Sequence, residues 1–217
     1  MMNEKLQQEG FRDELVFIGE TLGPFYLEDP AKGKAGAAFE AMRELDAAQA
    51  ASDWPFVEAS VALPLLKAMQ EGLEDGIDAE ALVWEYRRLF IGPAIKPAPP
   101  WGSVYTDRDG VVFGHSTLEL RSWMRQNGIA RLGSDTTPED HIGLLLLLMA
   151  WLAENRPELL EDFFRLHLLT WSSHFLEQLA AATEHPFYRG LAGLTQVSLE
   201  GIQTALHIRV EYPRFYR

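Results

Sequence analysis

The sequence predicts an all-α fold, a single globular bundle of about nine to ten helices over residues 1–217 with a proline-rich central loop. Hydrophobic residues recur at spacings of three and four almost throughout, whereas sustained alternation with a period of two, which is typical of strands, is nearly absent. With 217 residues, 47% of them hydrophobic, the chain is long enough to bury a sizeable core in one domain or a closely joined pair.

The first half of the chain is predicted to hold four helices. Two cover Arg12 to Leu22 and the alanine-rich stretch from Ala37 to Ala51, and a third runs from Val57 to Gly72, a residue type that often ends helices. Trp54-Pro55 separates the second from the third because proline interrupts helical hydrogen bonding. Asp78 is predicted to cap the fourth, which ends near Ile91. Its residues at three-to-four spacing form one apolar face: Leu82, Tyr86, Leu89 and Phe90.

Residues 92–114 form a stretch rich in proline and glycine, which we expect to be a loop and a candidate hinge between two helical halves. Prolines argue against helix there and against central strand over most of it. Long ordered loops are often functional, so this one is a candidate part of a binding site. The residues that interrupt regular structure are Gly92, Pro93, Pro97, Pro99, Pro100, Gly102, Gly110 and Gly114.

The second half begins with a helix that Ser116 is predicted to cap, and that ends at Asn127 before Gly128. Pro157 and Pro186 are predicted to open further helices, and the last of these ends near residue 208.

Between these helices, Thr136 and Glu139 have the spacing of a capping box, and Pro138 sits early in the predicted first turn. Glu139 and Asp140 would stabilise the positive end of the helix dipole by about 0.3–1 kcal/mol each. The helix that follows, to about Asn155, is apolar nearly all round. We therefore expect it to be central and buried.

Composition excludes several classes of function. There is no cysteine, which removes disulfides, thiolate metal sites and a cysteine nucleophile. The formal charge is 19 − 32 = −13, which disfavours nucleic acid and favours cationic partners. Residues 1–10 lack the features of a secretory signal, and the longest apolar run, Ile142 to Ala153, is about half of a membrane span. We expect a cytoplasmic protein.

One pair of residues invites a catalytic hypothesis. Asp140 and His141 are adjacent, but consecutive helical positions point about 100° apart, so the pair cannot readily chelate one metal ion. The sequence also lacks a nucleophile elbow, a Walker pattern and a dinucleotide-binding fingerprint. We predict no enzyme activity, no metal and no cofactor. The alternative is a hydrolase that uses His141 as base and Asp140 as its partner.

A second feature suggests peptide binding. The segment from Glu85 to Pro93 continues into Pro97 to Tyr105, and it places aromatic residues beside rigid prolines. Such a backbone loses little entropy on binding, so it could form one wall of a groove for an apolar peptide. The alternative is that Leu89, Phe90 and Trp101 only pack in the core. The pair Arg87-Arg88 is similar to a twin-arginine export signal, but we interpret the match as coincidence because no apolar signal stretch follows it.

Two stretches carry a resemblance to a known family. The run from Tyr86 to Tyr105, with LF-x-GP followed by PPWGSVY, and the run from Pro138 to Gly143 resemble signature stretches of the TorD/DmsD family of redox-enzyme maturation chaperones, in particular its DmsD branch. The resemblance covers roughly residues 80 to 200 and is weak before residue 75. Further similar stretches begin at Phe113, Trp123, Trp151 and His185.

The resemblance implies an all-α chaperone that binds the twin-arginine leader of a molybdoenzyme catalytic-subunit precursor, of the dimethyl sulfoxide reductase type, before export. The resemblance does not decide whether the chaperone contacts the twin-arginine (Tat) translocase. It also does not decide between a monomer and an exchangeable dimer. Two departures are Tyr86, where some relatives carry tryptophan, and Ala94, where relatives carry an aromatic residue. The residues that it implies line or support the leader site are Tyr86, Leu89, Phe90, Pro100, Trp101, Pro138, Asp140 and His141.

A binding hypothesis follows from these residues. Apolar leader side chains would bury against Leu89, Phe90 and Trp101, at about 1.5–3 kcal/mol for each large side chain fully buried. Leader arginines would meet Asp140, and exposed pairs of this kind add only about 0–1 kcal/mol. Alanine at position 140 should then weaken leader binding and cost less than about 1 kcal/mol of stability. Two alternatives are an assembly factor that binds a non-leader segment of a molybdoenzyme subunit, and a carrier of GTP or molybdenum cofactor.

Overall fold

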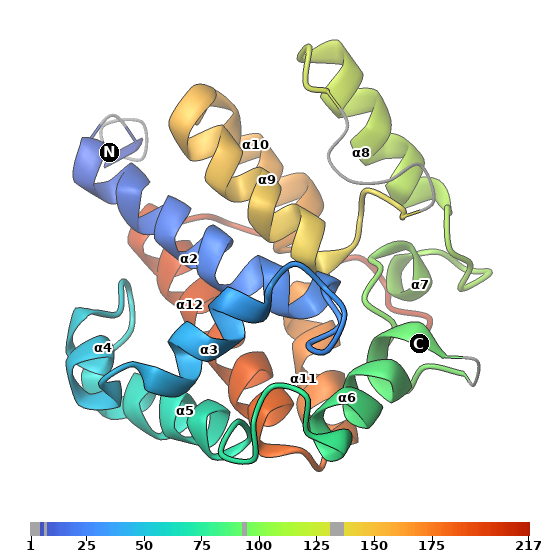
Figure 1. The fold of residues 1–217 in the computed structure, drawn as a ribbon. Coiled ribbons are helices and arrows are strands. Elements are labelled where there is room, and N and C mark those ends of the chain that lie inside the picture. Colours follow the sequence, from blue (N-terminus) through green and yellow to red (C-terminus); the bar gives the residue numbers. More distant parts are fainter. Residues whose placement is uncertain (1–4, 7, 93–94, 131–136) are drawn as a thin grey trace. The chain divides into compact units, whose positions relative to one another are not determined.

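The structure is a computed structural model that describes residues 5–6, 8–92, 95–130 and 137–217 (Figure 1). It confirms the all-α fold. Within these ranges there are eleven α-helices and three short 3-10 or π segments, and the described backbone forms no strand beyond one isolated bridge between Trp101 and His141. Among the helices of the described ranges, none combines the length and the apolar character of a membrane span.

The chain divides into two compact units. Unit 1 comprises Met1–Gly23, Pro100–Phe175 and Leu206–Arg217, and unit 2 comprises Pro24–Pro99 and Leu176–Ala205. One of the divisions, between Pro99 and Pro100, falls inside the candidate hinge at residues 92–114. The single domain expected over residues 1–217 stays a prediction.

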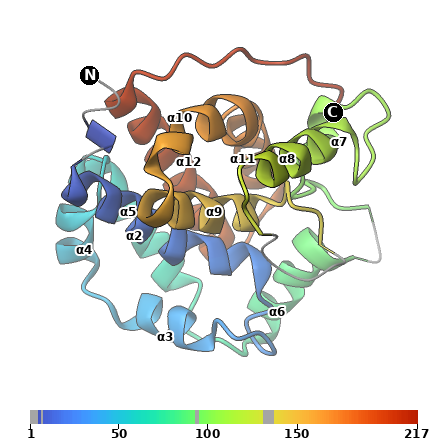
Figure 2. The same cartoon turned by 90° about the horizontal axis from the view of Figure 1, so that it is seen from above.

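Unit 1 is organised around α9, and ten of that helix's fourteen residues are buried, as its uniformly apolar sequence predicts. The first part of α2 lies along α9 (Figures 1 and 2). Gly19 permits this approach, because a Cβ there would overlap the Leu146 carbonyl oxygen and crowd Ala150. The helical segments of unit 1 are α2 (Glu9–Leu27, in part), α7 (Ser103–Thr106), α8 (His115–Gln126), α9 (Ile142–Asn155), η2 (Pro157–Leu159), α10 (Leu160–Phe163), η3 (Phe164–Leu168) and the start of α11 (Ser172–Ala182).

Unit 2 has an aromatic core in which the Phe39 ring centroid lies 4.7 Å from that of Phe25 and 5.2 Å from that of Phe187. Gly72, which ends α5, lies so close to Phe187 that any Cβ would overlap its backbone, so here the glycine serves packing as well as helix termination. The helical segments of unit 2 are α3 (Gly36–Glu44), α4 (Ala47–Asp53), α5 (Ala59–Glu71), α6 (Glu80–Tyr86), η1 (Arg87–Ile91), the end of α11 and most of α12 (Pro186–Leu206).

One predicted helix is two helices in the structure, and two predicted N-caps are wrong. The helix expected from Ala37 to Ala51 is two helices, because Asp46 accepts the Ala48 and Gln49 N–H groups and starts α4 anew. Asp78 does not cap α6, whose N-cap is Ala79, and Ser116 does not cap α8, which begins one residue earlier after Gly114.

The sequence predicted no helix between residues 92 and 114, but the structure has one short helix there, α7. Between Gly102 and Gly110 there is no proline, and the amides of Val104, Tyr105 and Asp107 bond to the carbonyls of Trp101, Gly102 and Ser103 to form α7. The predicted start of the central helix is also wrong. The Thr136 half of the proposed capping box lies outside the described residues, and α9 begins only at Ile142, after its N-cap His141.

Candidate functional site

The two signature stretches meet in unit 1. Trp101 and His141 form an antiparallel bridge, in which Gly102 N–H donates to the Asp140 carbonyl at 3.2 Å and Ile142 N–H donates to the Pro100 carbonyl at 2.9 Å. We call residues 100–103 together with residues 140–142 the loop–helix clip. The clip joins the proline-rich loop to the start of α9, so it holds together residues nearly forty positions apart.

The Asp140 carboxylate reinforces the clip. Its Oδ2 accepts the Ser103 N–H at 2.7 Å, and the side chain is buried. Burial raises the pKa of Asp140, and the Ser103 amide together with the neighbouring hydroxyls of Ser103 and Thr117 oppose that shift. Asp140 is therefore a crosslink between loop and helix. The sequence placed it in the first turn of the helix, whereas the structure places it before the N-cap of α9.

The cap of α9 is His141. Its Nδ1 accepts the Gly143 N–H at 3.1 Å, which satisfies one of the free amides of the first helical turn. Burial lowers the pKa of His141 to about 3, so the ring is neutral near pH 7 and Nδ1 can act as an acceptor. Asp140 and His141 both serve backbone amides, which is a structural use of the pair that had suggested a hydrolase.

Trp101 is the partly exposed member of the clip. Its ring centroid lies 5.7 Å from that of His141, with the two planes at 76°, an edge-to-face contact. Pro100 and Pro138, by contrast, are buried, and the Pro138 carbonyl accepts the His141 N–H at 3.2 Å. The predicted unit 1 residues therefore form one connected group in which Trp101 offers a side-chain surface and the other four support it.

The remaining predicted residues lie in unit 2. Tyr86, Leu89 and Phe90 are all at least 95% buried. Tyr86 and Phe90 have ring centroids 5.4 Å apart, and each also packs on Tyr188. This is core packing, which is the alternative considered for Leu89 and Phe90. The structure brings these residues together as a second group, and we describe it separately from the clip.

The two arginines that are similar to an export signal are occupied within unit 2. Arg87 Nε donates to Asp29 at 3.0 Å, and Arg88 forms a fork on Glu85. Both lie on the π-helical turn η1, inside a folded helix. This supports the interpretation of the match as coincidence. Ala94, the second departure from the family pattern, lies outside the described residues.

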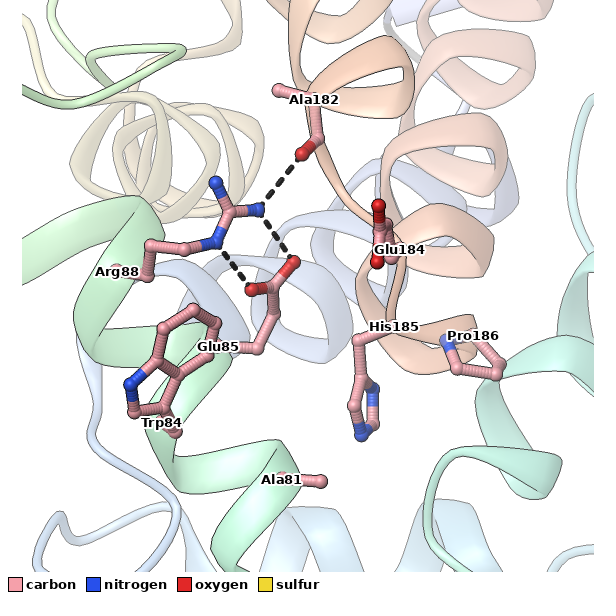
Figure 3. A pocket seen from close by; sticks show the side chains of 8 residues that line it. All are labelled: Ala81, Trp84, Glu85, Arg88, Ala182, Glu184, His185 and Pro186. Atoms are coloured by element: carbon pink, nitrogen blue, oxygen red, sulfur yellow. Dashed lines mark hydrogen bonds and ion pairs between the residues drawn. The ribbon is translucent and has the colours of Figure 1, made fainter.

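A pocket that the sequence did not single out lies in unit 2, with a volume of about 520 Å³ (Figure 3). The sequence carried one signal of it, because Trp84 falls off the apolar face formed by Leu82 and Tyr86. In the structure this side chain is 61% exposed. No cluster of three or more acidic or histidine residues that could hold a metal ion occurs in the described part of the chain. We call this site the Trp84 pocket; its lining residues are Ala81, Trp84, Glu85, Arg88, Ala182, Glu184, His185 and Pro186.

Comparison with known proteins identifies the class. A family described as "Nitrate reductase delta subunit" matches residues 58–177. The chain is 41% identical over 204 residues to the "Probable Tat proofreading chaperone DmsD" of Haemophilus influenzae, covering 94% of this chain and 97% of that protein. It is 39% identical over 207 residues to the "Tat proofreading chaperone DmsD" of Salmonella typhimurium, covering 95% and 97%.

A more distant relative is the "Chaperone protein YcdY" of Escherichia coli, 28% identical over 194 residues, which are 88% of this chain and 94% of that protein. All three relatives are named as chaperones, so the class of this protein is that of chaperones and not of enzymes. This removes the hydrolase alternative. The chain belongs to the TorD/DmsD family of redox-enzyme maturation chaperones, and its sequence is most similar to the DmsD branch.

Proposed function

We propose that this chaperone acts in the cytoplasm, binds the twin-arginine leader of a molybdoenzyme precursor of the dimethyl sulfoxide reductase type, and delays export until the cofactor is inserted. The observation that carries the proposal is the 41% identity, over nearly the whole of both chains, to a protein named as a Tat proofreading chaperone. The charge of −13 supports it, because an acidic surface attracts a peptide that carries paired arginines.

Within the clip, Trp101 is the residue that we assign to direct contact. Its side chain is partly exposed while its backbone is held by the bridge to His141, so little conformational entropy is lost when a ligand covers it. An apolar leader side chain that buries against it gains about 25 cal/mol per Å² of apolar surface. Pro100, Pro138, Asp140 and His141 position this ring.

Asp140 is not the arginine partner in this proposal. The residue is 3% exposed and its Oδ2 already accepts the Ser103 amide. Attraction of the leader arginines therefore falls to exposed acids elsewhere on the chain. Tyr86, Leu89 and Phe90 keep a supporting role, because they fix α6 and η1 from inside the core.

Variants of Trp101 test the contact. In a titration of the purified full chain with a twin-arginine leader, Trp101→Ala should weaken binding about tenfold, because roughly half of a large apolar side chain's burial is lost. Trp101→Phe should retain most of the affinity. Equal affinities of wild type and Trp101→Ala would remove the clip from the binding site.

A second candidate is an assembly factor that binds a non-leader segment of its client. It is favoured by one observation, the family description "Nitrate reductase delta subunit", which names a subunit and not a signal-peptide chaperone. Capture of a client precursor with and without its leader separates the two. The leader proposal expects capture only when the leader is present, and equal capture of both forms would favour the second candidate.

A further inference from the structure

The Trp84 pocket lies wholly in unit 2, between α6 and the turn that joins α11 to α12 (Figure 3). Trp84 stands on one side of the space and His185 on the other, and the small side chain of Ala81 leaves room beside them. A tryptophan that is 61% exposed is unusual, because this side chain normally buries its large apolar surface. Most of the Trp84 side chain therefore does not pack in the core, and it forms an aromatic wall of the pocket.

The single arginine of the pocket is already neutralised. Arg88 Nε donates to Glu85 Oε2 at 2.6 Å and Nη2 donates to Glu85 Oε1 at 2.8 Å, while Nη2 also donates to the Ala182 carbonyl at 2.8 Å. The Thr183 hydroxyl donates to Glu85 at 2.6 Å, so most of the acceptor capacity of that carboxylate is used. This pair supplies no free positive charge for an anionic ligand.

The remaining charge of the pocket is negative. Glu184 is exposed, and its negative charge acts on Arg88 from across the lining without a side-chain hydrogen bond between the two in the described part of the chain. Burial lowers the pKa of His185, so its ring adds no positive charge near pH 7. Among the lining side chains Glu85 and Arg88 cancel, so Glu184 gives the lining one net negative charge, and Arg189, which donates to the Thr183 and Glu184 carbonyls at 3.3 and 3.4 Å, lies outside that lining. This balance favours a cation.

The Trp84 ring already receives one guanidinium. The Arg88 Cζ lies 5.8 Å from the centroid of that ring, within the range of a cation–π contact. An aromatic ring has two faces, and Arg88 covers one of them. A planar guanidinium can also stack on the ring in a way that a lysine ammonium cannot.

We propose that the Trp84 pocket binds an arginine side chain of the client's leader, stacked against Trp84 and paired with Glu184. This assignment rests on the proposed function, because the twin-arginine leader supplies the cation. The sequence suggested Asp140 as the partner of a leader arginine, but Asp140 is buried. The Trp84 pocket offers a leader arginine another site.

The pocket can be tested without any leader. The full chain, labelled with ¹⁵N, is titrated with a capped arginine amide and separately with the capped citrulline amide, which has nearly the same shape but no charge. We expect a saturable shift of the Trp84 indole N–H signal, assigned with Trp84→Phe, for arginine and little shift for citrulline. Equal shifts from both amides, or a shift from neither, would overturn the proposal.

A double-mutant cycle tests the link to the leader. Trp84→Ala should weaken binding of a twin-arginine leader about threefold to tenfold, the range of a partly desolvated cation–π contact, and should leave unchanged the affinity of a leader whose arginines are replaced by citrulline. Tyr212→Ala is the matched control, because Tyr212 is 55% exposed and lies in unit 1. Glu184→Gln should act in the same direction, with the exposed Glu154→Gln as its control.

The outcomes separate the two proposals. A wild-type chain that binds no leader contradicts the proposed function, whereas the amide titration still decides the pocket. A chain that binds the leader, but shows no coupling between Trp84 and the leader arginines, retains the proposed function and loses the arginine site. Circular dichroism of each variant confirms that it is folded, which the exposure of Trp84 and Glu184 leads us to expect.

Discussion

At the residue scale, Asp140 and His141 show how two polar side chains with a catalytic appearance serve a backbone instead. Asp140 accepts the Ser103 amide and His141 accepts the Gly143 amide, and both residues lie just before α9 begins at Ile142. The sequence singled out both residues, but it placed Asp140 in the first turn of the helix and gave His141 no capping role. It could not do better, because the partner of Asp140 lies 37 positions earlier in a loop whose path is not encoded by local spacing.

Asp140→Ala is predicted to destabilise the protein by about 1–3 kcal/mol, because it leaves the buried Ser103 N–H without an acceptor. This exceeds the loss of less than about 1 kcal/mol that a helix-terminus charge would give. Asp140→Asn keeps an acceptor oxygen and should lose less. Urea denaturation of the three proteins measures the difference. A larger loss in the asparagine variant than in the alanine variant would contradict the role of the Ser103 bond.

His141 should make stability depend on pH. Its pKa is lowered from 6.5 to about 3 in the folded chain, so the unfolded chain takes up a proton first as the pH falls below 6.5. The stability that His141 contributes is fully present above pH 6.5. It is lost as the pH falls from 6.5 towards 3, at up to about 1.4 kcal/mol per pH unit. Asp140, whose pKa is raised by burial, acts in the opposite direction, because its protonation favours the folded chain.

The variant His141→Asn isolates the histidine contribution, because asparagine is a good N-cap and does not titrate. Unfolding free energies measured from pH 7 to pH 4 should fall less steeply for this variant than for wild type. His167, whose pKa burial lowers to about 4, remains in both proteins and cancels in the comparison. Parallel curves would show that His141 is not held neutral by its surroundings.

At the element scale, the approach of α2 to α9 depends on the absence of a side chain. Gly19→Ala is predicted to cost about 1–3 kcal/mol or more, because the added Cβ would overlap backbone of α9 that cannot move aside freely. Gly10→Ala, in the same helix, meets nothing within 4 Å and should gain up to about 1 kcal/mol from better helix propensity. Thermal unfolding of both variants measures the contrast, and similar effects at the two positions would refute the close-packing explanation.

Helices were predictable to the extent that their signals are local. The apolar run of α9 predicted a buried helix that ends at Asn155, as observed. Helix starts were less predictable, since Asp46 stops one helix and starts another through two hydrogen bonds, whereas Asp78 and Ser116 have similar chemistry and start none. A side chain that is able to cap a helix does so only where the tertiary structure makes a helix begin beside it.

At the scale of the whole molecule, the fold class was predictable because the three-to-four period runs through most of the sequence. The position of Trp84 off the apolar face was the only sequence signal of the Trp84 pocket. The pocket itself was not predictable, because it joins α6 to a turn about one hundred positions later, as the bond between Glu85 and Thr183 over 98 positions illustrates. Family resemblance did not supply it either, since the residues that it implied lie in the clip, at Pro138 beside the clip, and in the core of unit 2.

The whole-chain charge of −13 leads to a prediction about salt. Apolar burial should supply most of the leader's affinity, while charge raises the rate of encounter and sets orientation. Raising ionic strength from low to physiological should therefore weaken leader binding by less than about tenfold, because exposed charge pairs contribute little and are screened. Complete loss of binding over that range would reverse this ranking of the two forces.

The central claim is that this chaperone recognises a leader, and calorimetric titration of the purified full chain with synthetic leaders tests it most directly. The set should comprise the leaders of all molybdoenzyme precursors of the source cell, with non-Tat signal peptides as controls. We predict saturable one-to-one binding by at least one twin-arginine leader and none by the controls. No binding by any of these leaders, together with capture of a client that lacks its leader, would contradict the claim.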